Sequence, residues 1–125
     1  MEAFAPVTQP DPAQTLSKAV VRAAGMLDLS QSAVAEMLGI STASASRLFA
    51  GSYHLQRGRG KEWPLAVLFV RLFRSLDAIT GQGEAAQAWL RSPNRALGAV
   101  PKDLIGEPEG LVRVVHYLDA HRGHV

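Results

Sequence analysis

The stretch that most constrains the fold of this 125-residue chain lies at residues 29–51. Ser30 is a favourable N-cap for a first helix. The apolar face of that helix consists of Val34, Ala35 and Leu38. Gly39 permits a sharp turn, after which Ser41 can cap a second short helix that ends at Gly51. This order predicts a helix-turn-helix, whose second helix enters the DNA major groove. An ordinary helical hairpin uses the same residue types and is the alternative.

Charge is unevenly distributed along the chain, although the formal net charge is only +2. Residues 41–61 contain four Lys or Arg and no Asp or Glu, whereas residues 103–125 contain four acidic residues and two arginines. The basic stretch coincides with the second helix and the following loop, where DNA phosphates would lie. A solvated basic loop is the alternative. The predicted DNA-binding residues are Gln31, Thr42, Ser44, Ser46, Arg47, Arg57, Arg59 and Lys61.

Composition excludes several classes of protein. A hydrophobic content of 47% is too high for a disordered chain. The absence of cysteine excludes a disulfide framework and a thiolate metal site. No apolar run reaches the roughly 20 residues that span a bilayer, and the first residues do not resemble a signal peptide. We therefore expect a soluble, cytoplasmic protein that does not contact membranes.

Proline and glycine positions divide the chain into four expected regions. The first contains three prolines without apolar periodicity, which predicts an arm, and the second would open with a helix from about Leu16 to Leu27. The regions are a flexible arm (1–14), a helix-turn-helix DNA-binding region (15–62), a central helix (63–81) and a C-terminal domain (82–125).

The central helix carries more apolar residues than one buried stripe requires. It would begin near Trp63-Pro64 and end near Ile79, before Gly81. One side would pack on the helix-turn-helix, and the other would form a homodimer. The homodimer would also present two recognition helices to two DNA half-sites. A helix sandwiched within one monomer is the alternative.

The last third of the chain consists of short helical segments separated by Pro and Gly. A helix around residues 85–90 stops at Ser92-Pro93-Asn94, Pro101 opens a one-turn helix, and Pro108 starts the last helix. The apolar face of the last helix consists of Leu111, Val114, Val115 and Leu118. Helices this short are not stable alone, so they must pack together.

These segments follow a specific order of motifs: Trp89-Leu90, Pro93-Asn94, Leu97-Gly98, Pro101 with Leu104-Ile105, and Gly110 with Val114 and Leu118. In order and spacing they resemble the toxin-binding domain of the Xre/MbcA/ParS antitoxins over about residues 84–123. With the upstream helix-turn-helix, the resemblance covers about residues 15–123. It implies an all-α fold, with an N-terminal Xre/Cro-like helix-turn-helix followed by a small helical toxin-binding domain.

The resemblance also implies a partner and a role. Such antitoxins belong to type II toxin–antitoxin systems and neutralise a RES-domain toxin that uses NAD, by placing their C-terminal end at its active site. The complex would also repress its own operon by binding operator DNA. The implied toxin-binding residues are Trp89, Asn94, Gly110, Arg113, His116, Tyr117, Asp119, His121, Arg122, Gly123, His124 and Val125.

The expected recognition helix differs from those that make many direct contacts with DNA bases, because residues 42–46 all have short side chains. Bidentate base recognition requires Arg, Asn or Gln. Sequence-specific binding would therefore depend on Arg47, the basic loop and a larger assembly with the toxin.

No catalytic or metal-binding pattern is evident. His116, His121 and His124 do not share one helical face, and no carboxylate set accompanies them. The chain also lacks a nucleophile elbow and a glycine-rich loop after a strand. We expect no enzyme activity, metal or cofactor.

Two functions remain open at this point: an antitoxin, or a stand-alone helix-turn-helix repressor whose C-terminal domain only dimerises. The short polar tail after Leu118 favours the antitoxin, because a pure dimerisation domain has no use for a segment that reaches beyond its own fold.

Overall fold

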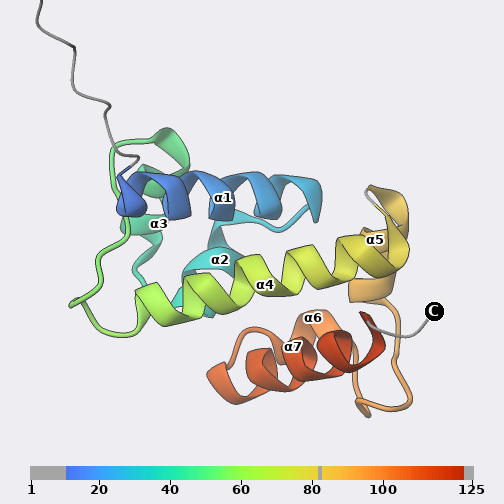
Figure 1. Ribbon diagram of the computed structural model, residues 1–125. Helices are drawn as coiled ribbons and strands as arrows, with labels where there is room; N and C mark the ends of the chain where they lie inside the picture. Colours follow the sequence, from blue (N-terminus) through green and yellow to red (C-terminus); the bar gives the residue numbers. More distant parts are fainter. Residues whose placement is uncertain (1–10, 82, 123–125) are drawn as a thin grey trace, which may run out of the picture.

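The computed structural model describes residues 11–81 and 83–122, and within them the chain is all-helical (Figure 1). The helices are α1 (Pro12–Met26), α2 (Gln31–Leu38), α3 (Thr42–Ala50), α4 (Glu62–Thr80), α5 (Glu84–Arg91), α6 (Pro101–Leu104) and α7 (Pro108–Arg122). The extended pairing in the described part is an isolated bridge between Asn94 and Ala99. The predicted fold class is confirmed.

Helix α1 begins earlier than the sequence suggested. Its N-cap is Asp11, whose carboxylate accepts a hydrogen bond from the Ala13 amide at 3.0 Å, and Pro12 occupies the first helical position. Proline is well suited to that position because its fixed φ is already helical. The expectation of an arm up to residue 14 was therefore wrong for residues 12–14, and residues 1–10 lie outside the described part of the chain.

The helix-turn-helix has the predicted caps. The Ser30 hydroxyl accepts from the Ala33 amide and the Ser41 hydroxyl from the Ser44 amide, both at 3.0 Å. Gly39, with φ of 69°, ends α2 in the left-handed conformation that side chains with a Cβ rarely adopt. Caps and turn together place α3 across α2.

Helix α4 runs through the centre of the molecule. Helix α1 lies along one side of it and α7 along the other, and α2 and α5 also contact it (Figure 1). The wide apolar surface of α4 is therefore largely covered within the monomer, as in the alternative given above. The large hydrophobic side chains that stay exposed in the described part are Val67 (47%) and Ile79 (42%).

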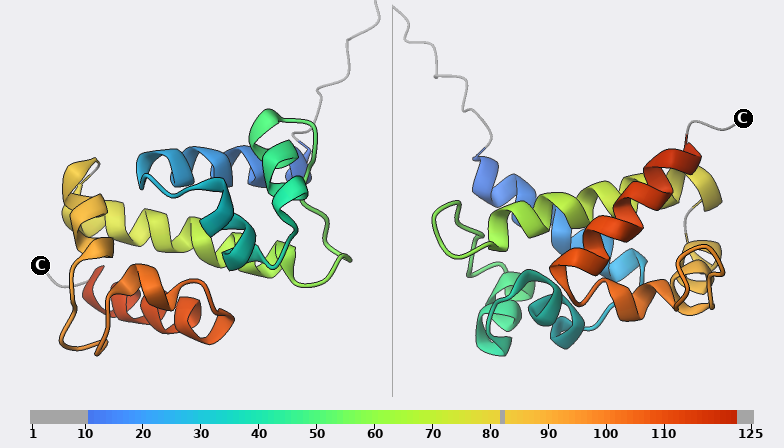
Figure 2. Two further views of the ribbon diagram at one scale, coloured as in Figure 1. Left: turned by 180° about the vertical axis from the view of Figure 1, so that it is seen from behind. Right: turned by 90° about the horizontal axis from the view of Figure 1, so that it is seen from below.

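Helices α4 and α7 run in the same direction, with α7 lying across α4 in the view from below (Figure 2). Two neighbouring parallel helices need a return connection, and α5 and α6 provide it. Phe69 and Leu72 of α4 belong to the same buried cluster as Leu111 and Leu118 of α7. The helix-turn-helix and the C-terminal helices therefore share one core.

Candidate functional site

The predicted recognition helix presents part of the expected surface. Thr42, Ser46 and Arg47 of α3 are exposed, as is Gln31 at the start of α2. Ser44 is only 9% exposed, and its hydroxyl accepts a hydrogen bond from the Ser41 hydroxyl at 3.0 Å. The expectation that Ser44 contacts DNA was therefore wrong, because this side chain belongs to the N-cap of α3.

The three basic residues of the following loop are exposed and lie close to the start of α4. The Arg57 guanidinium lies 4.2 Å from the centroid of the Trp63 ring, and that of Arg59 lies 5.8 Å from the Tyr53 ring. Such cation–π contacts orient a guanidinium while leaving its N–H groups available to an anion. Together with Lys61, these side chains form a cationic edge beside α3, which we call the basic loop.

A buried glutamate that the sequence analysis missed holds this loop in place. Glu62 is 4% exposed, and its Oε2 accepts hydrogen bonds from the Tyr53 hydroxyl (2.5 Å) and the Gln56 amide (2.9 Å). Burial, and then the neighbouring Glu62 carboxylate, raise the pKa of Tyr53 to about 12. The sequence did offer a signal for this contact, because Glu62 is the first acidic residue after the basic stretch 41–61.

The other end of the loop is fixed to α1. The Leu55 amide donates a hydrogen bond to the buried Ser17 hydroxyl at 2.9 Å, and Ser17 donates to the Ala13 carbonyl at 2.7 Å. The Leu55 side chain is fully buried. The basic loop is therefore an ordered element with anchors on both α1 and α4.

In the C-terminal region, α5 and α7 bring together aromatic residues from the predicted toxin-binding set. Trp89 and Tyr117 stack with centroids 6.1 Å apart, and the Tyr117 and His121 rings lie 4.2 Å apart. We call these three residues the aromatic row. Trp89 and Tyr117 are half-buried, while His116 and Arg113 on the same helix, α7, are exposed.

Two other residues of the predicted set have structural roles. Asn94 closes the turn after α5, where its side-chain oxygen accepts from the Leu97 amide at 3.0 Å. Gly110 is buried, and a Cβ built there would lie 2.7 Å from the carbonyl carbon of Leu104 and closer still to its oxygen. The expectation that Gly110 contacts the toxin was wrong, since it is the point where α7 passes against the end of α6.

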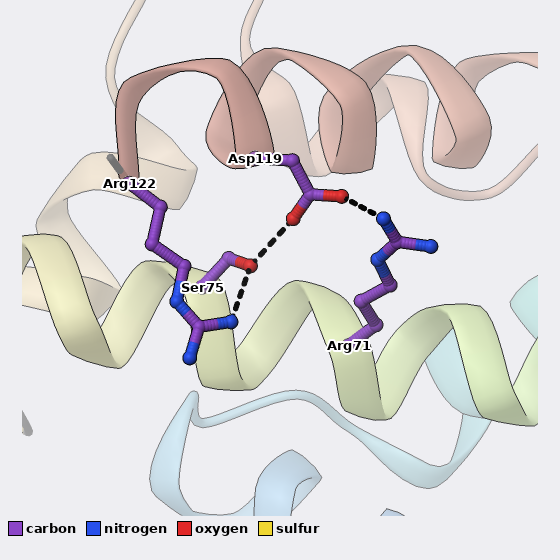
Figure 3. Close-up of polar contacts among 4 residues, drawn as sticks. All are labelled: Arg71, Ser75, Asp119 and Arg122. Atoms are coloured by element: carbon purple, nitrogen blue, oxygen red, sulfur yellow. Dashed lines mark hydrogen bonds and ion pairs between the residues drawn. The ribbon is translucent and has the colours of Figure 1, made fainter. Parts of the chain in front are cut away.

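Asp119 and Arg122 are directed toward α4 (Figure 3). Asp119 Oδ1 accepts from the Ser75 hydroxyl at 2.7 Å, its Oδ2 forms an ion pair with Arg71, and Arg122 Nη1 donates to Ser75 at 3.4 Å. Asp119 belongs to the implied toxin-binding set, but its carboxylate is already paired within the chain, with Ser75 and Arg71. Gly123, His124 and Val125 lie outside the described residues.

Side-chain hydrogen bonds also join the C-terminal region to the end of α1. Arg91 at the end of α5 donates to the carbonyls of Leu27 (3.0 Å) and Asp28 (2.6 Å), and Gln87 Nε2 donates to that of Met26 (3.0 Å). The last carbonyls of a helix have no partner within the helix, so these side chains cap α1 from another part of the chain.

Two classes of site have no support in the described residues. Across 11–81 and 83–122, no three His, Cys, Asp or Glu side chains are grouped so that they could hold a metal ion. Within the same residues, no helix is both long and apolar enough to cross a membrane.

Comparison with known proteins agrees with this arrangement. The chain matches the antitoxin Xre-like helix-turn-helix domain over residues 6–71 and the antitoxin Xre/MbcA/ParS C-terminal toxin-binding domain over residues 75–123. Both matches extend into α4, which therefore belongs to both domains. No curated protein sequence matches the chain significantly.

A solved structure extends this agreement to three dimensions. A chain in the crystal structure of the M. tuberculosis MbcT–MbcA toxin–antitoxin complex is 27% identical, with a TM-score of 0.64, and the match covers 88% of this chain and 96% of that one. The protein therefore belongs to the Xre/MbcA/ParS family of helix-turn-helix antitoxins.

Proposed function

We propose that this antitoxin neutralises a RES-domain toxin that uses NAD, by covering the toxin's active site, and that it acts as an inhibitor and not as an enzyme. The observation that carries the proposal is the match of residues 75–123 to a toxin-binding domain, together with the partly exposed aromatic row on that domain. Half-buried aromatic residues suit a protein interface because they bury large areas on binding and lose little conformational entropy.

The contact surface would combine two parts. The aromatic row, with Arg113 and His116 on the same helix, would dock against the body of the toxin. The end of α7 and the residues after it would reach the NAD cleft, where His124 can donate a hydrogen bond to a phosphate oxygen. Asp119 has no part in this contact, since its carboxylate is held by Ser75 and Arg71.

The experiment is co-expression of each antitoxin variant with a RES-domain toxin, with measurement of complex formation and of cellular NAD. Deleting residues 123–125 leaves the described contacts of His121 and Arg122 in place, and should preserve complex formation but abolish NAD protection. His116→Glu should weaken complex formation, whereas His54→Glu, in the helix-turn-helix region, is the matched control. Full protection by the truncated chain would place inhibition on the helices, and failure of the intact chain to bind the toxin would overturn the proposal.

We also propose that the helix-turn-helix represses the antitoxin's own operon. Arg47 would read bases, and Arg57, Arg59 and Lys61 would contact phosphates. Replacing these three loop residues by Ala should weaken binding to all DNA sequences and reduce the salt dependence by up to about three units of slope. Lys102→Ala, on α6, is the control, and Arg47→Ala should reduce operator preference. Unchanged binding in both the triple variant and Arg47→Ala would contradict the assignment.

The proposed repressor would act as a homodimer, since two half-sites multiply the weak affinity of a single module. Light scattering at increasing protein concentration tests this. The stand-alone repressor makes the opposite prediction for the toxin experiment: DNA binding and dimerisation without any complex with a RES-domain protein.

A further inference from the structure

A groove of about 690 Å³ lies between α1 and the middle of α4. It is lined by residues of the first half of α1, by residues in the middle of α4 and by Arg122 of α7. It includes Val67, the most exposed of the large hydrophobic side chains described. We call it the α1–α4 groove.

The lining of the α1–α4 groove specifies the chemistry of an occupant. Its lining has an apolar part, with Leu16, Val67 and Val70, and a cationic part, with Arg71, Arg74 and Arg122. None of the described residues that line it is acidic. A complementary ligand would present an apolar side chain to the apolar part and a carboxylate to Arg74 and Arg122, since Arg71 is already paired with Asp119.

We propose that the segment preceding α1 in the same chain, residues 2–9, occupies the α1–α4 groove. This segment has the sequence EAFAPVTQ, in which Phe4 matches the apolar part of the lining and Glu2 matches the cationic part. Glu2 is nine positions before Asp11, so Glu2 can lie up to about 30 Å from the start of α1. The part of α1 that lines the groove, Pro12 to Ala19, spans only about 11 Å.

Connection and composition both favour this occupant. Pro12, which lines the groove, directly follows the N-cap of α1, so the segment enters at the edge of its own site. Pro6 and Pro10 restrict the backbone before docking and thereby reduce the entropy that docking costs.

A second copy of the chain fits the α1–α4 groove less well. A two-fold interface places the same patch of both copies face to face. Arg71 and Arg74 would then meet the arginines of the other copy, together with Lys18 and Arg22, which line the adjoining groove. Repulsion between these cations opposes self-association here, whereas Glu2 pairs with them.

The test uses the absence of cysteine from the chain, which makes an introduced thiol unique. The labelling rate of Val67→Cys with a thiol reagent is compared between the full chain and a chain without residues 2–9. We expect labelling about fivefold slower in the full chain, the ratio that about 1 kcal/mol of docking free energy produces. Ile79→Cys is the control, because it has similar exposure outside the groove and should label equally in both chains.

If the deletion disturbs folding, Ile79→Cys will be labelled faster in the shortened chain than in the full chain. Point variants of the full chain then provide the test. In the full chain, Phe4→Ser should restore fast labelling of Val67→Cys, and Gln9→Ser should not. Equal rates in the full chain and the Phe4→Ser chain would overturn the proposal. Protection that increases with protein concentration would also overturn it, by identifying the occupant as part of a second copy.

Discussion

The helices before α4 and those after it are held by different kinds of interaction. In the N-terminal half, α1 to α3, each helix begins at its own capping side chain, namely Asp11, Ser30 or Ser41. In the C-terminal half, the described residues give α5 and α6 no side-chain cap. There, Arg91 and Gln87 reach the carbonyls of α1, and Arg113 donates to the carbonyl of Leu97 at 2.8 Å.

The difference shows that the C-terminal half depends on the N-terminal half for its order. Helices of eight and four residues, such as α5 and α6, do not form alone in water. They are stable because their side chains and apolar faces complete the shared core. A partner that binds the aromatic row therefore binds a surface that α1 and α4 hold in place.

The largest expected effect is that of Gly110→Ala. Its new methyl group would overlap the Leu104 carbonyl, so α7 would have to move away from α6. We expect a loss of about 3 kcal/mol or more in the free energy of unfolding, together with loss of toxin binding. Urea denaturation followed by circular dichroism measures the first quantity.

The matched control is Gly25→Ala in the N-terminal half. Gly25 lies in α1, and beyond its chain neighbours and the backbone of its own helix, no heavy atom of the described residues comes within 4 Å of a Cβ at that position. Alanine should therefore stabilise the chain by about 0.5–1 kcal/mol. Equal effects of the two substitutions would contradict the tight contact at Gly110.

The next effect in size is expected for Arg91→Ala. This change removes two charged hydrogen bonds to the end of α1 and should cost about 2 kcal/mol. Arg95→Ala, at an exposed arginine four residues later, should change stability by less than about 0.5 kcal/mol. The loss in free energy of unfolding for Arg91→Ala should exceed that for removal of a single helix cap. If it does not, the C-terminal half does not depend on its hydrogen bonds to the N-terminal half.

The same contrast explains what could be predicted from sequence. Caps and glycine turns are local signals, so the starts of α2 and α3 and the turn at Gly39 were predicted correctly. The proline-opened helices α6 and α7 were also predicted, because proline marks a first turn. The contacts of Glu62, Asp119 and Arg91 with other segments join residues from 6 to 64 positions apart, and residue order alone does not show such partners.

Burial explains the errors in the candidate site. Ser44 and Gly110 lie in motifs typical of the family, but a motif does not distinguish residues that shape a surface from those that form it. The structure assigns Ser44 to the capping hydrogen bonds of α3 and Gly110 to packing. The exposed members of the DNA-binding set, and the aromatic row, stay predictions until binding is measured.

A smaller effect is expected for a single cap in the N-terminal half. Ser41→Ala removes the hydroxyl that accepts from the Ser44 amide and should cost about 1 kcal/mol. Ser46→Ala, on the exposed face of α3, should be neutral or slightly stabilising because alanine has the higher helix propensity. Thermal unfolding of both variants compares them, and a greater loss in Ser46→Ala would contradict the assigned cap.

The basic loop departs from the rest of the N-terminal half, because tertiary contacts hold it and no local cap does. The pKa of Tyr53 is raised to about 12, so the protonated phenol is favoured by folding. Its stabilising contribution is complete below the unfolded pKa of about 10 and is lost as the pH rises toward 12.

Tyr53→Phe should cost only about 1 kcal/mol at neutral pH, since one hydrogen bond is removed and Glu62 still accepts from the Gln56 amide. Between pH 10 and 12, the stability advantage of the wild type over Tyr53→Phe should shrink and then reverse, because a shift from 10 to about 12 corresponds to more than the roughly 1 kcal/mol that the hydrogen bond contributes. Phenolate absorbance should show one tyrosine titrating near 12 in the wild type but not in the variant. Titration of that tyrosine near pH 10 would mean that the loop is held by the Leu55–Ser17 contact and not by Glu62.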